Sequence, residues 1–143
     1  LVGVSKAQIA KLQRIQNAAS RLITGAKSAD HVTPILKSLH WLPVHLRIQF
    51  KLLLITYKVL NGAGPTYLRD LLVYYEPGRA LRSSKDTKML QIPITRLKTY
   101  GDRSFSRAAP AHWNNLPSNI RSSKTLTGFK TSLKTLLFRS YYV

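Results

Sequence analysis

The chain has 143 residues, 44% of them hydrophobic, so we expect a single domain that buries roughly two-thirds of its unfolded surface. Its 23 Lys and Arg residues face only five acids, Asp30, Asp70, Glu76, Asp86 and Asp102, which gives a formal net charge of +18. The apolar content excludes wholesale disorder, and the absence of cysteine excludes a disulfide framework and a zinc site with thiolate ligands.

The first predicted element is a helix that Ser5 caps and that runs to about Ile23, with Gly25 as its stop. One arc of this helix is apolar and the opposite arc is cationic. The apolar arc comprises Ile9, Leu12, Ile15, Ala19, Leu22 and Ile23, and the cationic arc comprises Lys11, Arg14 and Arg21. We therefore expect the apolar arc to pack on the domain and the cationic arc to supply phosphate contacts.

A short helix, PILKSL, is expected next, because Thr33 can cap it and Pro34 suits a first helical position. It ends at Trp41-Leu42-Pro43, where a longer helix begins.

The longer helix is predicted over about residues 44–60 and ends at Asn61-Gly62. It is apolar on most sides, and its basic residues Arg47, Lys51 and Lys58 fall within one narrow stripe. The uncharged run 52–57 is far shorter than the roughly 20 residues that a membrane span needs. The segment is therefore predicted to be a central helix with Leu53 and Ile55 in the core and with one accessible basic edge.

Pro65-Thr66 is expected to open another short helix, TYLRDLL, after which the helical periodicity is lost. Residues 73–103 read as a long basic loop, in which MLQIPITRLKTY supplies one or two short strands around Pro93. Phosphate contacts are expected here, and the alternative is an ordinary solvated loop. The basic residues concerned are Arg79, Arg82, Lys85 and Lys88.

The last 40 residues are expected to be helical again. The segment 104–115 has helical composition with Pro110 inside it, which predicts a kink or two short pieces that end at Leu116-Pro117. Leu126, Phe129, Leu133, Leu136 and Leu137 then predict an amphipathic helix to the C-terminus, with Lys130 and Lys134 off its apolar stripe.

Two tryptophans each lie just before a Leu-Pro pair, in WLP and in WNNLP. Trp41 with Pro43, and Trp113 with Pro117, are therefore predicted to be structural anchors at helix ends. The alternative is an aromatic platform on which unpaired bases stack.

The sequence offers little for catalysis. The five acids are scattered singly, so no local carboxylate pair is present for acid–base or two-metal chemistry. The four histidines have no metal-ligand spacing, and the glycines form no phosphate loop. We therefore expect no enzymatic activity, no metal and no cofactor.

The charge points instead to an anionic partner. An excess of +18 repels itself in a compact chain unless a partner neutralises it, and RNA or DNA is the first candidate because Lys and Arg drive affinity for phosphates. The alternative is a domain with a cationic surface and no role in nucleic-acid binding.

Several blocks of the sequence resemble one known family. They are KLQRIQNAASRLITG (11–25), DHVTPILKSLHWLPVHLRIQFKLLLITYKVLNG (30–62), PTYLRDLL (65–72), RALRSS (79–84), YGDRSFSRAAPAHWNNLPSNIR (100–121) and FKTSLKTLLF (129–138). In this order they resemble the C-terminal region of reverse transcriptases from non-LTR retrotransposons, the LINE-like elements of the CR1, L2 and jockey type. In that family an endonuclease and the polymerase palm precede this region.

The resemblance implies a mainly α-helical C-terminal module, residues 1–143, of an RNA-directed DNA polymerase. About five to six helices are expected, in a helical half (1–72), a basic loop (73–103) and C-terminal helices (104–143). The implied role is non-catalytic association with template RNA and target DNA, with the upstream polymerase domain as a further partner. The chain begins at Leu1 and its only methionine is Met89, so a fragment of a longer reading frame is expected, in the reducing nucleus or cytoplasm. A structural or protein-interaction domain, and a remnant without function, stay open as alternatives.

Overall fold

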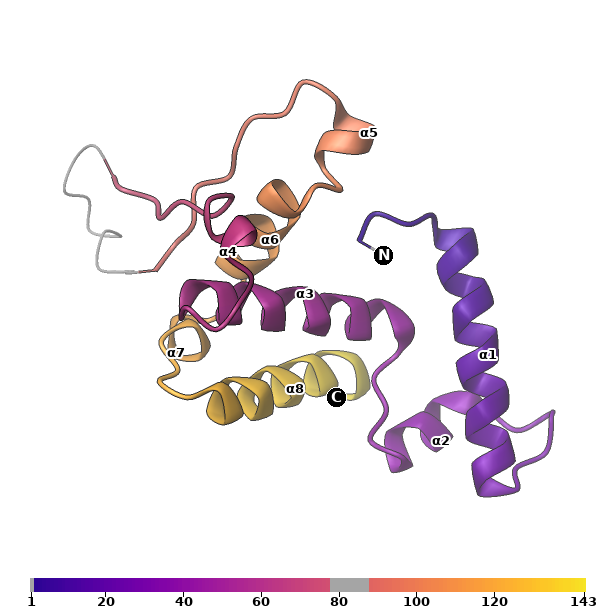
Figure 1. The fold of residues 1–143 in the computed structure, drawn as a ribbon. Coiled ribbons are helices and arrows are strands. Elements are labelled where there is room, and N and C mark those ends of the chain that lie inside the picture. Colours follow the sequence, from indigo (N-terminus) through magenta and orange to yellow (C-terminus); the bar gives the residue numbers. More distant parts are fainter. Residues whose placement is uncertain (1, 78–87) are drawn as a thin grey trace.

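The computed structural model of the protein describes residues 2–77 and 88–143, and within these ranges the chain is mainly helical, as predicted. Figure 1 shows α3 at the centre with α8 alongside it, while α1 stands at the N-terminal end of α3 and α2 connects the two. The helices are α1 (Lys6–Thr24), α2 (Val32–Ser38), α3 (Val44–Leu60), α4 (Thr66–Arg69), α5 (Lys98–Gly101), α6 (Phe105–Asn114), α7 (Ser118–Arg121) and α8 (Leu126–Tyr142).

Helix α3 is the central helix that the sequence predicts. Leu53 has no exposed surface, and the neighbouring residues of the helix on several sides are also buried. Ile55 was expected in the core but is only half-buried, because it faces a groove between α3 and α1. At the end of the helix the chain turns back so closely that a Cβ on Gly64 would lie 2.9 Å from the backbone of Val59. None of the helices in the described ranges is long and apolar enough to cross a membrane, in agreement with the sequence.

Helix α8 packs along α3 through an aromatic contact. The ring of Phe129 stacks on Tyr57 with 4.2 Å between centroids, and Trp113 of α6 lies 5.9 Å from the same Phe129 ring. The predicted apolar stripe of α8 is buried here, with Phe129 and Leu133 fully enclosed. Thr125 caps the helix by accepting a hydrogen bond from the amide of Gly128.

Helix α6 is one helix from Phe105 to Asn114 with Pro110 inside it, so the predicted alternative of two short pieces is wrong. Proline removes one backbone donor from the helix, which costs stability. Ala109 and Trp113, on either side of it, are almost completely buried against α3 and α8. Burial of this face offsets the cost, so two separate pieces do not form.

The described part of the predicted basic loop returns to the core beside Leu90. A single antiparallel bridge joins Tyr74 to Leu90, and the described residues hold no longer strand. The side-chain amide of Asn114 accepts from the Leu90 amide at 2.9 Å and donates to its carbonyl at 2.8 Å. The expected strands around Pro93 are thus reduced to one bridge, and the unforeseen helix α5 follows it.

The ends of α1 are as predicted, but its packing face is not. The Ser5 hydroxyl caps the first turn, and Gly25 ends the helix at a φ of 68°. The expected apolar contact face is largely open to solvent, with Ile15 67% and Leu22 86% exposed. Helix α1 is held instead through polar residues, and Gln16 is its most buried long side chain.

Helix α2 begins two residues earlier than expected. His31 stands at the N-cap position, so Thr33 and Pro34 lie within the first turn. Proline is tolerated there because the first amides of a helix have no partner within it.

Candidate nucleic-acid interface

A pocket of about 440 Å³ lies where α3, α8 and the turn before α3 meet. Its basic residues are Arg47 and Lys51 of α3 and Lys134 of α8, all exposed, and no acid within the described ranges lines it. Arg47 and Lys51 are one helical turn apart, so their side chains leave α3 on the same face. The remaining lining residues are His40, Trp41, Leu42 and Phe50.

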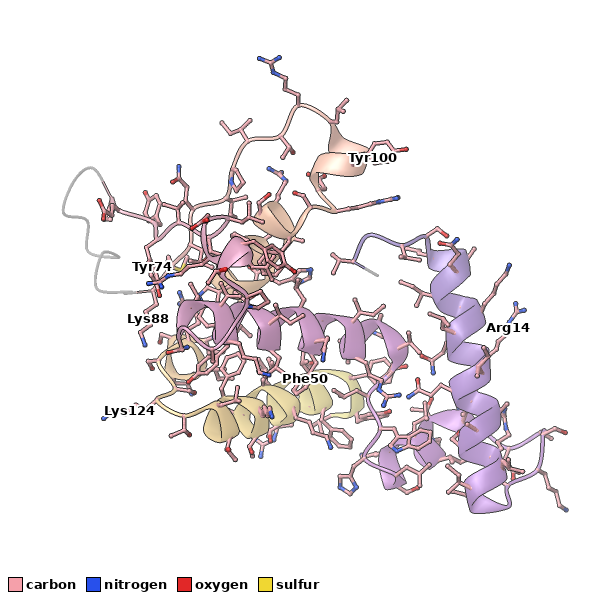
Figure 2. The ribbon with its side chains drawn as sticks, in the orientation of Figure 1. Arg14, Phe50, Tyr74, Lys88, Tyr100 and Lys124 are labelled. Carbon is pink, nitrogen blue, oxygen red and sulfur yellow. The ribbon has the colours of Figure 1, made fainter. Side chains whose placement is uncertain are left out.

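The antiparallel packing of α3 and α8 brings Lys134 to this pocket. Phe129, near the start of α8, stacks on Tyr57, near the end of α3. Residues further along α8 must then lie beside the earlier turns of α3, which carry Arg47 and Lys51. Figure 2 shows Phe50 on the side of α3 that faces α8.

The end of α8 fixes the turn that forms the rim of the pocket. The hydroxyl of Tyr142 donates a 2.7 Å hydrogen bond to the carbonyl of Trp41, and the Lys37 ammonium donates to the carbonyl of Tyr142 at 3.3 Å. The His40 ring stacks on Phe138, with 5.5 Å between centroids. His40 adopts a φ of 53°, the left-handed region that non-glycine residues rarely enter, and the ring contact helps to hold it there.

Sequence reasoning missed this aromatic cluster at the pocket. The signal for it was present as His40, Trp41 and His45 in one short stretch and Phe138, Tyr141 and Tyr142 in another. Only the packing of α8 against the turn shows that the two stretches meet.

The two tryptophans have different surroundings. Trp113 is 1% exposed, and its indole Nε1–H donates to the carbonyl of Lys88 at 2.8 Å, so its ring is not accessible to a base. Trp41 is half-buried and lines the pocket of Arg47 and Lys51. Pro43 is buried at the start of α3. Pro117 is exposed, and its carbonyl accepts from the amide of Ile120 in the first turn of α7.

The other basic residues singled out from the sequence lie outside this pocket. Lys11 and Arg14 are exposed on α1, and Figure 2 shows Arg14 pointing away from α3. Arg21 is half-buried and donates from Nη2 to the carbonyl of Asp30 at 3.0 Å, so a partner would have to displace that contact. Lys58 is half-buried, and Lys130 is exposed on α8.

Of the four loop residues expected to contact phosphates, Arg79, Arg82 and Lys85 lie outside the described residues. Lys88 is described and exposed, and its φ is 77°. Its carbonyl is held by Trp113, so the side chain starts from a fixed backbone position.

Burial shifts the pKa of two groups. Desolvation raises the pKa of Tyr142, and the nearby Tyr141 raises it further, so the Tyr142 hydroxyl keeps its proton and remains a donor to Trp41 at neutral pH. Desolvation lowers the pKa of His112 on α6, which favours the neutral imidazole.

The described ranges hold no group of three or more His, Asp or Glu residues that could bind a metal ion. What the site offers chemically is positive charge beside an aromatic ring, which is suited to phosphate contacts. Comparison of the chain with protein-family models, with curated proteins and with solved structures gave no match.

Proposed function

We propose that this chain is a non-catalytic module that binds RNA or DNA through its phosphates. The observation that carries the proposal is the meeting of Arg47, Lys51 and Lys134 around one pocket, which no acid lines in the part of the chain that the structure describes. Exposed Lys and Arg side chains contact phosphates without desolvating their charge, and they release counterions as they do so.

Two further observations support this proposal. The net charge of +18 favours an anionic partner over a neutral one. The resemblance of the sequence blocks to the C-terminal region of LINE-like reverse transcriptases supports a module that assists template RNA and target DNA, beside an upstream polymerase domain and inside the nucleus or cytoplasm. Phosphate contacts position a protein without reading bases, so binding through them is expected to discriminate poorly between sequences.

The proposal is tested by comparing two triple variants that lose the same charge. One variant carries Arg47→Ala, Lys51→Ala and Lys134→Ala, and the control carries Lys6→Ala, Lys27→Ala and Lys124→Ala at exposed positions outside the pocket. Filter binding to labelled single-stranded RNA and to single-stranded DNA is measured at one low salt concentration, and circular dichroism checks the fold.

Loss of positive charge at the pocket is expected to weaken nucleic-acid binding more than loss of the same charge elsewhere. The pocket variant is expected to bind about tenfold more weakly than the control on every sequence tried, which corresponds to about 1.4 kcal/mol. Equal affinities of the two variants would move the binding site away from this pocket. Absence of binding by the folded wild type would favour the protein-interaction alternative.

A further inference from the structure

A stripe of apolar residues on α1 has no packing partner among residues 2–77 and 88–143. Leu12, Ile15 and Ala19 lie on one side of this helix, and the stripe continues to Leu22 and Ile23, which are 86% and 62% exposed. Contiguous apolar surface of this kind is uncommon on a protein with no binding partner there.

Helix α1 is positioned by polar contacts that leave this stripe open. The Gln16 side chain donates to the carbonyl of Leu42 at 2.9 Å, and the Gln13 side-chain oxygen accepts from the amide of Val44 at 2.9 Å. These two side-chain amides fix α1 against the start of α3, and they lie on the face of α1 next to the apolar stripe. The stripe is therefore held at a fixed angle to α3 without packing on it.

The space between the stripe and α3 is an apolar groove, which we name the α1–α3 groove. Its volume is about 670 Å³, within the range of protein ligand sites. Each wall repeats apolar residues at the three- and four-residue spacing of a helix. The wall residues on which the argument depends are Leu12, Ile15 and Ala19 on α1, and Val44, Ile48 and Ile55 on α3.

Among the residues that the structure describes, the only charged side chains that line the groove are Arg47 and Lys51, and no acid lines it. They lie on the ridge of α3 between the groove and the pocket that also contains Lys134. An occupant of the groove therefore meets an apolar floor and a cationic edge.

We infer that the α1–α3 groove docks one amphipathic helix of a partner protein, with leucine-like residues on its inner face and Asp or Glu along one flank. When apolar residues recur at helical spacing on two neighbouring helices, the side chains of a third helix can pack into the groove between them. The acidic flank pairs with Arg47 and Lys51.

A second copy of this chain does not have the required chemistry. Helices α1 to α8 contain no Asp or Glu, so none of them offers an acidic flank to Arg47 and Lys51. Two copies would instead bring these cations toward like charges. Nucleic acid is suited only to the cationic edge at Arg47 and Lys51, because the apolar residues that line the rest of the groove give phosphates no hydrogen-bond donors.

The test uses a designed helical peptide of about 18 residues, roughly five turns, labelled with fluorescein. It carries leucines on one face and glutamates on the flank. One control peptide replaces the leucines by serine and keeps the glutamates, and a second keeps the leucines and replaces the glutamates by lysine. Anisotropy titrations use the full chain at near-physiological salt.

The protein variants distinguish binding in the groove from non-specific binding to exposed apolar residues. Ile15→Ser with Ile48→Ser alters the groove, and Ile94→Ser with Leu97→Ser is the control, because Ile94 and Leu97 are exposed and lie outside it. The leucine–glutamate peptide is expected to bind at least about tenfold more tightly than either control peptide. The groove variant is expected to lose this preference for the leucine–glutamate peptide, and the control variant is expected to keep it. The pair Arg47→Glu and Lys51→Glu is expected to prefer the lysine peptide.

Three results would overturn the inference. The first is equal binding of the leucine and serine peptides, which would leave only attraction between opposite charges. The second is a sedimentation result in which the wild type is a dimer and the groove variant is a monomer, which would make a second copy the occupant. The third is loss of RNA binding by the folded groove variant, which would assign the groove to nucleic acid.

Discussion

The hydroxyl of Tyr142 reaches the backbone carbonyl of Trp41 with a 2.7 Å hydrogen bond, so the last turn of the chain fixes the turn that opens α3. Trp41 in turn lines the pocket that contains Arg47, Lys51 and Lys134. The position of the basic residues on α8 relative to those on α3 thus depends on a contact made by the last turn of α8.

Tyr142→Phe removes this hydrogen bond and keeps the ring. It is expected to lower the free energy of unfolding by about 0.5–1.5 kcal/mol in urea at neutral pH. Because the folded-state pKa of Tyr142 is raised above its usual 10.0, the unfolded chain ionises first as the pH rises. Wild-type stability is therefore expected to fall above about pH 10, and Tyr142→Phe is expected to lose less over the same interval. Parallel pH curves for the two proteins would contradict this.

The lowered pKa of His112 predicts that the free energy of unfolding also depends on pH on the acid side, where it falls as the pH falls. Burial lowers its pKa below 6.5 in the folded chain, so the unfolded chain takes up the proton first as the pH falls. Stability is expected to be fully present above about pH 6.5 and to decline below it. His112→Gln is expected to flatten that decline. A decline that survives His112→Gln would assign it to other groups.

Leu53→Ala tests the core of α3. Leu53 has no exposed surface, and its truncation leaves a cavity in the hydrophobic core. The expected loss is about 2–5 kcal/mol in the free energy of unfolding, measured by chemical denaturation. Ile55→Ala is the comparison on the same helix, and it is expected to cost less because Ile55 is half-buried. Equal costs would contradict the burial pattern.

The two tryptophans are expected to report RNA binding differently. Trp113→Phe leaves Trp41, in the basic pocket, as the only fluorophore of its kind, and Trp41→Phe leaves the enclosed Trp113. Added single-stranded RNA is expected to change the emission of the first protein and not that of the second. A response from Trp113 at unchanged stability would show that the buried site opens to bases.

The strongest local patterns predicted the helices well. Helix α3 begins and ends as expected, because Pro43 and Asn61-Gly62 punctuate an apolar run, and α8 follows its leucine spacing. The packing face of α1 could not be read in the same way. Its sequence shows which arc is apolar but not which arc is covered, and the contacts that position it come from Gln13 and Gln16.

The candidate site was predictable only in part. Arg47 and Lys51 share a face by helical spacing, which the sequence shows directly. The addition of Lys134 depends on the antiparallel contact between Tyr57 and Phe129, which no local pattern encodes. The sequence left open whether Pro110 kinks α6 or divides it, because the continuity of this helix depends on burial against other helices.

The salt dependence of RNA binding tests the central claim most directly. Fluorescence anisotropy with labelled single-stranded RNA is measured from about 50 to 200 mM salt, and if roughly 6–10 phosphates are engaged the affinity is expected to fall by about 10³–10⁵-fold. The triple variant Arg47→Ala, Lys51→Ala and Lys134→Ala is expected to have a log–log slope shallower by about two, since each single-strand contact contributes about 0.7. A folded wild type that shows no binding at about 50 mM salt, or an affinity that is insensitive to salt, would contradict the account.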